Sequence, residues 1–158
     1  MFNQTRKYPV GIQTFSELRK GDYVYIDKTD LMWQMTRTKY IFLSRPRRFG
    51  KSLLTTTLDS YFKGEKQYFE GLKIMGLERE WETYPVIHVD LSIAKAETSV
   101  EGLREVLLRL LDKYKNIYGE GAYETSPGGL LSGIIQRAHT SRQASRLWSS
   151  SMNTMPPF

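Results

Sequence analysis

The sequence has 158 residues, of which 40% are hydrophobic and 25% are charged, a composition typical of a folded domain rather than of a disordered chain. It contains no Cys and only two His, which excludes disulfides and thiolate metal sites and argues against a His-rich metal site. No apolar run approaches the roughly 18 residues that a membrane span needs, and residues 1–7 lack the apolar run of a signal peptide. We therefore expect a cytoplasmic protein that makes no use of a membrane.

The net charge of +6 is unevenly distributed along the chain. Residues 1–52 contain 11 Lys and Arg against 4 Asp and Glu, which gives +7, whereas residues 53–138 contain 10 against 13, which gives −3. The basic excess surrounds Arg45, Arg47 and Arg48. Such a cluster fits a polyanion, either the phosphates of a nucleotide or a nucleic acid, and the alternative is a solvated basic face.

The first half of the chain is expected to alternate between strands and helices. Residues 23–26 are rich in β-formers and follow a turn, and residues 31–37 follow capping residues that can open a helix. Residues 40–43 form a continuous apolar run, which is what a strand buried on both faces of a parallel sheet requires. Apolar residues over 53–62 recur at helical spacing, and residues 68–77 are broken by two Gly into short helical pieces.

The second half repeats this order. Residues 85–90 predict a second buried strand, with Pro at the first position, where a missing N–H costs nothing. Residues 98–101 match a capping box before the longest helix, over 100–114, and residues 126–135 predict another short helix. The alternation predicts an α/β fold with a parallel sheet flanked by helices.

Arg45–Ser52 lies between the predicted buried strand at 40–43 and an amphipathic helix. The phosphate-binding pattern G-x-x-x-x-G-K-[ST] occurs in the same context, between a strand and a helix. Gly50, Lys51 and Ser52 match the pattern, but Arg45 stands where the first Gly is expected, so the match is partial.

The chemistry of phosphate binding fits these residues. Backbone N–H groups of such a loop and of the following helix N-terminus attract phosphate oxygens, and Gly50 lets the backbone approach closely. We expect Lys51 to reach the β- and γ-phosphates of ATP and Ser52 to ligate Mg²⁺. The alternative is a basic turn that binds nothing. The expected nucleotide-binding residues are Arg45, Pro46, Arg47, Arg48, Phe49, Gly50, Lys51 and Ser52.

Four stretches resemble the AAA-ATPase-like family of bacterial ATP-binding proteins, and they are Tyr8–Ile12, Tyr25–Thr29, Phe42–Leu54 and Tyr84–Asp90. The resemblance runs from about residue 8 to residue 138. Arg in place of the first Gly looks like a feature that members of the family share. It implies a P-loop ATPase module, here its N-terminal part. Longer members carry a C-terminal PD-(D/E)XK nuclease-like domain, for which this chain is too short, and we assign no nuclease site.

Four further polar residues have two possible roles each. Asp90 ends the second predicted strand and could reach Mg²⁺ through water, or it could cap the following turn, and in the family this strand is not the Walker B strand. Asp27 and Lys28 could contact the nucleotide or cap a helix. His88 lies inside the predicted strand, where we expect packing or hydrogen bonding rather than catalysis.

The segment after residue 138 departs from the family. The family implies an apolar strand ending in Asp-Glu, the Walker B pair, but residues 146–158 read as neither a strand nor a domain ending. If each new codon starts at the third base of an old one, with TCN serine codons and TTG for Leu147, the codons over Arg146–Pro157 allow Val-Val-Val-Leu-Val-Asp-Glu-Tyr-Asp-Ala-Pro. We therefore interpret residues 1–138 as the P-loop domain and 139–158 as an out-of-frame, unstructured tail.

The expected function follows from these two regions. The chain should bind ATP and Mg²⁺ through a degenerate Walker A loop, while hydrolysis should be weak or absent because the catalytic Asp-Glu pair is lost. One alternative is a nucleic-acid-binding module that uses the Arg45, Arg47 and Arg48 patch. The other is a truncation product without function. The sequence does not identify a protein partner.

Overall fold

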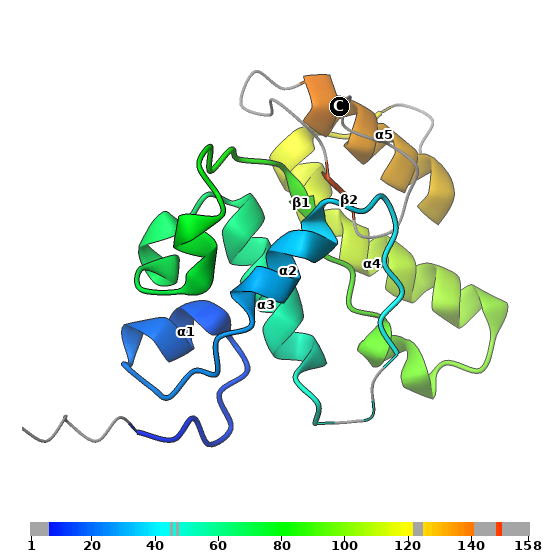
Figure 1. The fold of residues 1–158 in the computed structure, drawn as a ribbon. Helices are drawn as coiled ribbons and strands as arrows, with labels where there is room; N and C mark the ends of the chain where they lie inside the picture. Colours follow the sequence, from blue (N-terminus) through cyan, green and yellow to red (C-terminus); the bar gives the residue numbers. More distant parts are fainter. Residues whose placement is uncertain (1–6, 45, 47, 122–124, 141–147, 150–158) are drawn as a thin grey trace, which may run out of the picture. The chain divides into compact units, whose positions relative to one another are not determined.

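A computed structural model describes residues 7–44, 46, 48–121, 125–140 and 148–149. The chain divides into two compact units, residues 1–83 and residues 84–158, which are described one at a time below. Unit 1 contains the elements α1 (Phe15–Lys20), α2 (Thr29–Thr36), α3 (Lys51–Phe62) and the 3-10 helices η1 (Lys66–Phe69) and η2 (Lys73–Gly76). Unit 2 contains β1 (Val86–Ile87), the 3-10 helix η3 (Leu91–Ala96), α4 (Val100–Tyr118), α5 (Pro127–Thr140) and β2 (Trp148–Ser149) (Figure 1).

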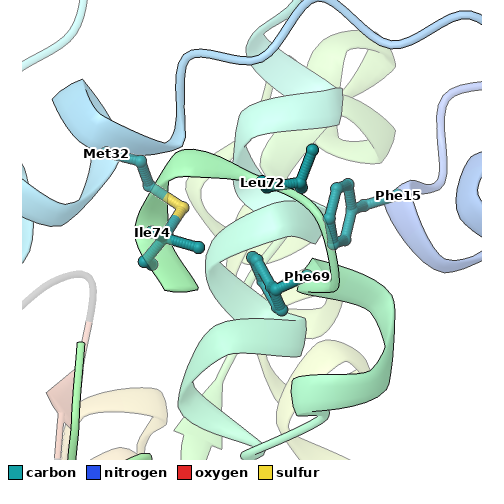
Figure 2. Packing of buried hydrophobic residues seen from close by; sticks show 5 residues of the cluster. All are labelled: Phe15, Met32, Phe69, Leu72 and Ile74. Carbon is teal, nitrogen blue, oxygen red and sulfur yellow. The ribbon is translucent and has the colours of Figure 1, made fainter. Parts of the chain in front are cut away.

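The core of unit 1 is a cluster of five buried side chains contributed by α1, α2 and the η1–η2 segment (Figure 2), namely Phe15, Met32, Phe69, Leu72 and Ile74. The rings of Phe15 and Phe69 lie 4.8 Å apart between centroids, a spacing that adds a favourable aromatic contact to the burial of apolar surface. The apolar face of α3 packs against this cluster through Leu53, Leu54, Leu58 and Tyr61. Unit 1 is therefore built around the helix that follows the predicted phosphate loop.

The predicted helices of unit 1 are confirmed. The helix expected at 31–37 is α2, and the helix expected at 53–62 is α3. Gly64, just past the end of α3, has a φ of 70°, the left-handed conformation in which Gly commonly ends a helix. The short helical pieces expected at 68–77 correspond to η1 and η2.

The predicted α/β fold with a parallel P-loop sheet is wrong. The strands of the described residues are β1 and β2, which pair in parallel over two residues each, and the remaining regular structure is helical. Residues 40–43 form neither helix nor strand, and Tyr40 and Phe42 are 59% and 93% exposed. In the segment expected to be the first strand, Tyr23 makes only an isolated bridge with Lys7.

The physical reason for this correction is the lack of neighbouring strands. A strand that is apolar on both faces becomes buried only when other strands take its backbone hydrogen bonds and helices cover its two faces. Among the described residues, no strand pairs with residues 40–43. The apolar run therefore stays at the surface, although its composition is that of a buried strand.

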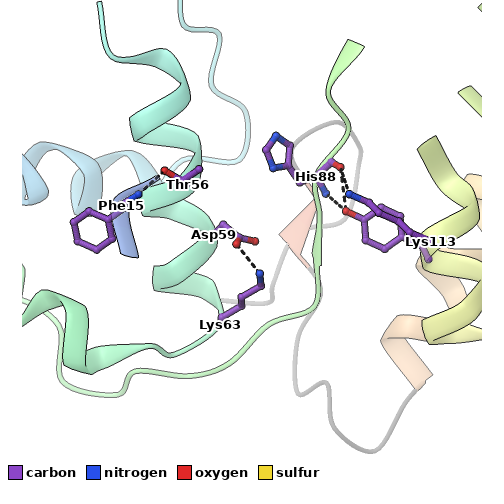
Figure 3. Close-up of polar contacts among 7 residues, drawn as sticks. Phe15, Thr56, Asp59, Lys63, His88 and Lys113 are labelled. Carbon is purple, nitrogen blue, oxygen red and sulfur yellow. Dashed lines mark hydrogen bonds and ion pairs between the residues drawn. The ribbon is translucent and has the colours of Figure 1, made fainter. Parts of the chain in front are cut away.

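The strand expected at 85–90 is shortened to β1, because side chains of α4 form hydrogen bonds with the backbone of the residue that follows β1. The hydroxyl of Tyr114 accepts a hydrogen bond from the N–H of His88 at 2.5 Å and donates to the carbonyl of the same residue at 3.0 Å. The Nζ of Lys113 donates to that carbonyl as well, at 3.3 Å (Figure 3). With both backbone groups of His88 engaged by side chains, the strand ends at Ile87.

The core of unit 2 lies between β1, α4 and α5 and consists of Ile87, Leu111, Tyr114, Leu130 and Ile134. The cap of α4 is one residue later than predicted, because Ser99 Oγ, rather than Thr98, accepts the hydrogen bond, from the N–H of Gly102 at 3.0 Å. The helix expected at 126–135 is confirmed as α5 and continues to Thr140, two residues into the predicted tail. Most of that tail lies outside the described residues.

Candidate phosphate-binding loop

The backbone angle φ changes sign from residue to residue just before α3. Arg48 has a φ of 68° and Gly50 a φ of 74°, while Phe49 between them is not left-handed. Lys51 then begins the right-handed helix. A left-handed residue followed directly by a right-handed one, as at Gly50 and Lys51, turns successive N–H groups toward one side and favours anion binding. Arg48 is under conformational strain there, since a side chain costs free energy at positive φ.

The N-terminus of α3 adds positive charge to the same place. Gly50 is the residue before the helix, and its carbonyl accepts the N–H of Leu54 at 2.9 Å. The first turn contains no acidic residue, and no side chain caps it. Because its own first turn carries no carboxylate, the helix start keeps its partial positive charge, which suits an external anion.

The described residues of the loop are open to solvent. The exposed ones are Pro46, Arg48, Phe49, Gly50, Lys51 and Ser52. Arg45 and Arg47, the other two predicted nucleotide-binding residues, lie outside the described residues. A Cβ built on Gly50 would meet no atom within 4 Å, so its positive φ rather than crowding makes Gly the suitable residue there.

The helix behind the loop is held at its middle and at its far end. Thr56 Oγ1 accepts the N–H of Phe15 at 3.1 Å and so satisfies a donor at the start of α1 (Figure 3). Near the C-terminus of α3, the hydroxyl of Tyr61 donates to Glu78 Oε2 at 2.5 Å. An exposed loop is thus mounted on a helix that is fixed to the rest of unit 1.

Glu78 accepts several hydrogen bonds within unit 1, a role that the sequence analysis did not predict. Its Oε2 also accepts the indole N–H of Trp33 at 3.2 Å, and its Oε1 accepts the N–H groups of Arg79 and Glu80 at 2.9 and 3.0 Å. Partial burial alone would raise the pKa of the Glu78 carboxyl, but the four hydrogen bonds outweigh burial and hold the pKa below its usual value. No sequence motif marks this position, because its partners come from 17 and 45 residues away.

Of the two roles considered for Asp27, its contacts agree with capping the start of α2 rather than with a side chain available to a nucleotide. Its Oδ1 accepts the N–H and the hydroxyl of Thr29, at 2.9 and 2.7 Å, and its Oδ2 accepts the N–H of Lys73 at 2.8 Å. Burial raises the pKa of Asp27, but these hydrogen bonds outweigh it and lower the pKa overall. Lys28 is the residue just before α2, and its side chain forms no capping hydrogen bond with the helix.

Ser52 and Asp90, the two predicted Mg²⁺ residues, belong to different units. Asp90 Oδ1 accepts the N–H of Ser92 at 2.8 Å and caps η3, which agrees with the turn-capping reading. In the part of the chain that the structure describes, no group of three or more His, Asp or Glu side chains is arranged to hold a metal ion. No described helix is both long and apolar enough to cross a membrane.

Comparisons with known proteins assign the chain to a family. A family model described as "Predicted AAA-ATPase" matches residues 9–146, so the last twelve residues lie outside the match. A protein of Azotobacter chroococcum mcd 1, named "Uncharacterized protein in vnfD 5'region", is 43% identical over 86 residues. These residues are 53% of this chain and 17% of that relative, so the chain spans only a small part of the relative's length. No solved structure matches the chain.

Proposed function

Because the chain belongs to the predicted AAA-ATPase family, we propose that Arg45–Ser52 binds ATP as a degenerate Walker A loop. The observation that supports this most is the alternating backbone at Arg48 and Gly50, which leads directly into the uncapped start of α3. Backbone N–H groups turned to one side and a positive helix end favour the same ligand, a phosphate group.

The loop residues have separate roles in this proposal. The Lys51 ammonium neutralises the β- and γ-phosphates, and the Ser52 hydroxyl ligates the Mg²⁺ that bridges them. Gly50 supplies the left-handed turn that brings the backbone to the phosphates. Arg45, Arg47 and Arg48 add positive charge around the nucleotide. Asp90, the second predicted Mg²⁺ residue, accepts the N–H of Ser92 as the cap of η3, and we give it no role at this loop.

We further propose that this chain hydrolyses ATP poorly. The amino-acid sequence from residue 139 supplies no apolar strand ending in Asp-Glu, whereas the shifted reading frame of the same gene can encode one. Without a carboxylate pair to hold Mg²⁺ and activate water, turnover should fall by about two orders of magnitude or more. Sequencing the gene tests the cause, since AGC or AGT codons at Ser149–Ser151 would contradict a frame break.

Calorimetric titration of the whole chain with ATP, with and without Mg²⁺, tests the binding site. We expect binding that is tightened by Mg²⁺ and weakened at least tenfold by Lys51→Ala. Lys66→Ala is the matched control, because it removes the same charge from an exposed position in unit 1 outside the loop. If the wild-type chain shows no binding up to low-millimolar ATP, or if both variants lose affinity equally, the proposed site is wrong.

A second candidate function is nucleic-acid binding by the Arg45, Arg47 and Arg48 patch, favoured by the basic excess of the first 52 residues. Lys51→Ala separates it from the first, since phosphate-backbone contacts shared among several cations are weakened only slightly by the loss of one. A truncation product without function would bind neither ligand. It would also lack a cooperative unfolding transition.

A further inference from the structure

The side-chain hydroxyl of Thr56, on α3, contacts the start of α1, 41 residues earlier in the chain. Its Oγ1 accepts the N–H of Phe15 at 3.1 Å (Figure 3). The same oxygen lies 3.0 Å from the carbonyl oxygen of Leu53 and 3.2 Å from that of Gln13. The hydroxyl has a single hydrogen, so it can donate to only one of these carbonyls at a time. Whichever carbonyl accepts it, the hydroxyl connects the first half of α3 with the start of α1.

This contact lies one helical turn behind the residues expected to bind phosphate and Mg²⁺. Ser52 and Thr56 are four residues apart on α3, so their side chains lie on the same side of the helix. The rise of an α-helix places them about 6 Å apart along its axis. Leu53, whose carbonyl lies within reach of the Thr56 hydroxyl, directly follows Ser52. Because a helix is stiff over a single turn, a displacement of Thr56 also displaces the start of α3.

The start of α1 is a fixed point within unit 1. The side chain of Phe15 is completely buried in the core. At the other end of α1, Arg19 donates from Nε to the carbonyl of Tyr68 at 2.8 Å and from Nη2 to that of Glu70 at 2.6 Å. Because α1 is held at both ends, the N–H of Phe15 has a defined position, and so does the Thr56 hydroxyl that accepts it.

We propose that Thr56 is a positioning residue for the phosphate loop, which acts by holding the start of α3 against α1. The loop needs such support, because Lys51 and Ser52 are exposed and no side chain caps the first turn of α3. Groups that bind a ligand lose affinity when the residues that support them let them move, even over small distances. The inference rests on the proposed ATP binding and adds a residue outside Arg45–Ser52 on which that binding depends.

A purely structural role of Thr56 would have a different consequence. Thr56→Val keeps the shape of the side chain but removes the hydroxyl, so the N–H of Phe15 loses its partner and unit 1 becomes less stable. A loss of stability alone does not change the affinity for a ligand as long as nearly every chain is folded. ATP affinity, measured at a temperature where all variants are folded, therefore separates positioning from stability.

Calorimetric titration of the whole chain with ATP and with inorganic triphosphate tests the inference. We expect Thr56→Val and Thr56→Ala to weaken the binding of both ligands about fivefold, and Thr56→Ser, which retains the hydroxyl, to bind like wild type. Thr36→Val is the matched control. Thr36 is also half-buried, and its hydroxyl donates at 2.7 Å to the carbonyl of Trp33, three residues back within α2, so its loss should leave the affinity unchanged.

The outcomes separate this inference from the proposed function. If the wild-type chain binds neither ATP nor triphosphate, ATP binding itself is refuted, and the role of Thr56 falls with it. If the wild type binds and Thr56→Val keeps the wild-type affinity, only the inference is overturned. It is also overturned if Thr36→Val costs as much, if Thr56→Ser fails to restore binding, or if the loss occurs with ATP but not with triphosphate, since Thr56 would then act away from the phosphates.

Discussion

Replacing Glu78 by Gln tests how strongly the end of α3 is tied to unit 1. Gln has nearly the same shape but no charge, and it offers one carbonyl oxygen where the carboxylate offers two. The carbonyl can keep the N–H groups of Arg79 and Glu80 at the positions they now occupy. The amide NH₂ would then face Trp33 and Tyr61, which both donate to Glu78 at present.

The expected cost follows from these contacts. The Tyr61 hydroxyl can rotate and accept from the new NH₂, but the indole N–H of Trp33 can only donate and loses its partner. A hydrogen bond to a charged group contributes about 1.5–3 kcal/mol, and the partial exposure of Glu78 reduces this value. We therefore expect Glu78→Gln to lower the free energy of unfolding of unit 1 by about 1–2 kcal/mol, or the Tm by roughly 5–15 °C.

Urea unfolding followed by tryptophan fluorescence measures this change, because Trp33 itself lies in the affected contact. The pH dependence gives a second signature. The pKa of Glu78 is lowered from 4.5 in the folded state, so its stabilisation is complete above about pH 4.5 and is lost as the pH falls through the folded value. The difference in stability between wild type and Glu78→Gln should thus be constant near neutral pH and shrink below pH 4.5.

Glu80→Gln is the control, since it removes the same charge from an exposed side chain two residues away. A loss below about 0.5 kcal/mol for Glu78→Gln, or a loss equal to that of Glu80→Gln, would refute the reasoning from the four hydrogen bonds. A difference that persists unchanged to pH 3 would show that the charge of Glu78 is not the source of the stabilisation.

Two further predictions concern the backbone. Gly50→Ala should destabilise unit 1 by about 1 kcal/mol because of the positive φ, while Gly50→Asn should cost less since Asn tolerates that conformation; equal costs in urea unfolding would contradict this. Tyr114→Phe should lower the stability of unit 2 by about 1–3 kcal/mol, because it leaves both backbone groups of His88 without the hydroxyl; thermal unfolding by circular dichroism measures the loss, with the less buried Tyr118→Phe as control.

The helices could be predicted from the sequence because their signals are local. The spacing of apolar residues over 53–62 and 100–114, together with Gly64 and Gly119 after them, reports which face is buried and where each helix ends. The strands could not be predicted in the same way, since a strand depends on partners distant in the chain. Residues 40–43 have the composition of a buried strand but meet no partner strand among the described residues.

The same distinction between local signals and distant contacts applies to the candidate site. The loop was predicted from the Gly50-Lys51-Ser52 tripeptide together with the strand and helix expected on either side of it. The structure adds the left-handed conformation of Arg48, which no residue preference suggests. Glu78 and Thr56 were missed, because their roles depend on contacts made across the fold. Asp27 and Asp90 show the opposite case, in which an acidic residue near a predicted site turns out to cap a turn or helix.

The hydroxyl of Tyr114 also protects the end of a strand against pairing with another molecule. A strand end with unpaired N–H and C=O groups is a template on which a second chain can add, and it is a common starting point of aggregation. At His88 both groups already engage Tyr114, so an incoming strand would have to displace a buried side chain before it could extend β1 at that residue. We therefore expect Tyr114 to limit self-association through this strand end, in a unit whose described residues form only one pair of two-residue strands.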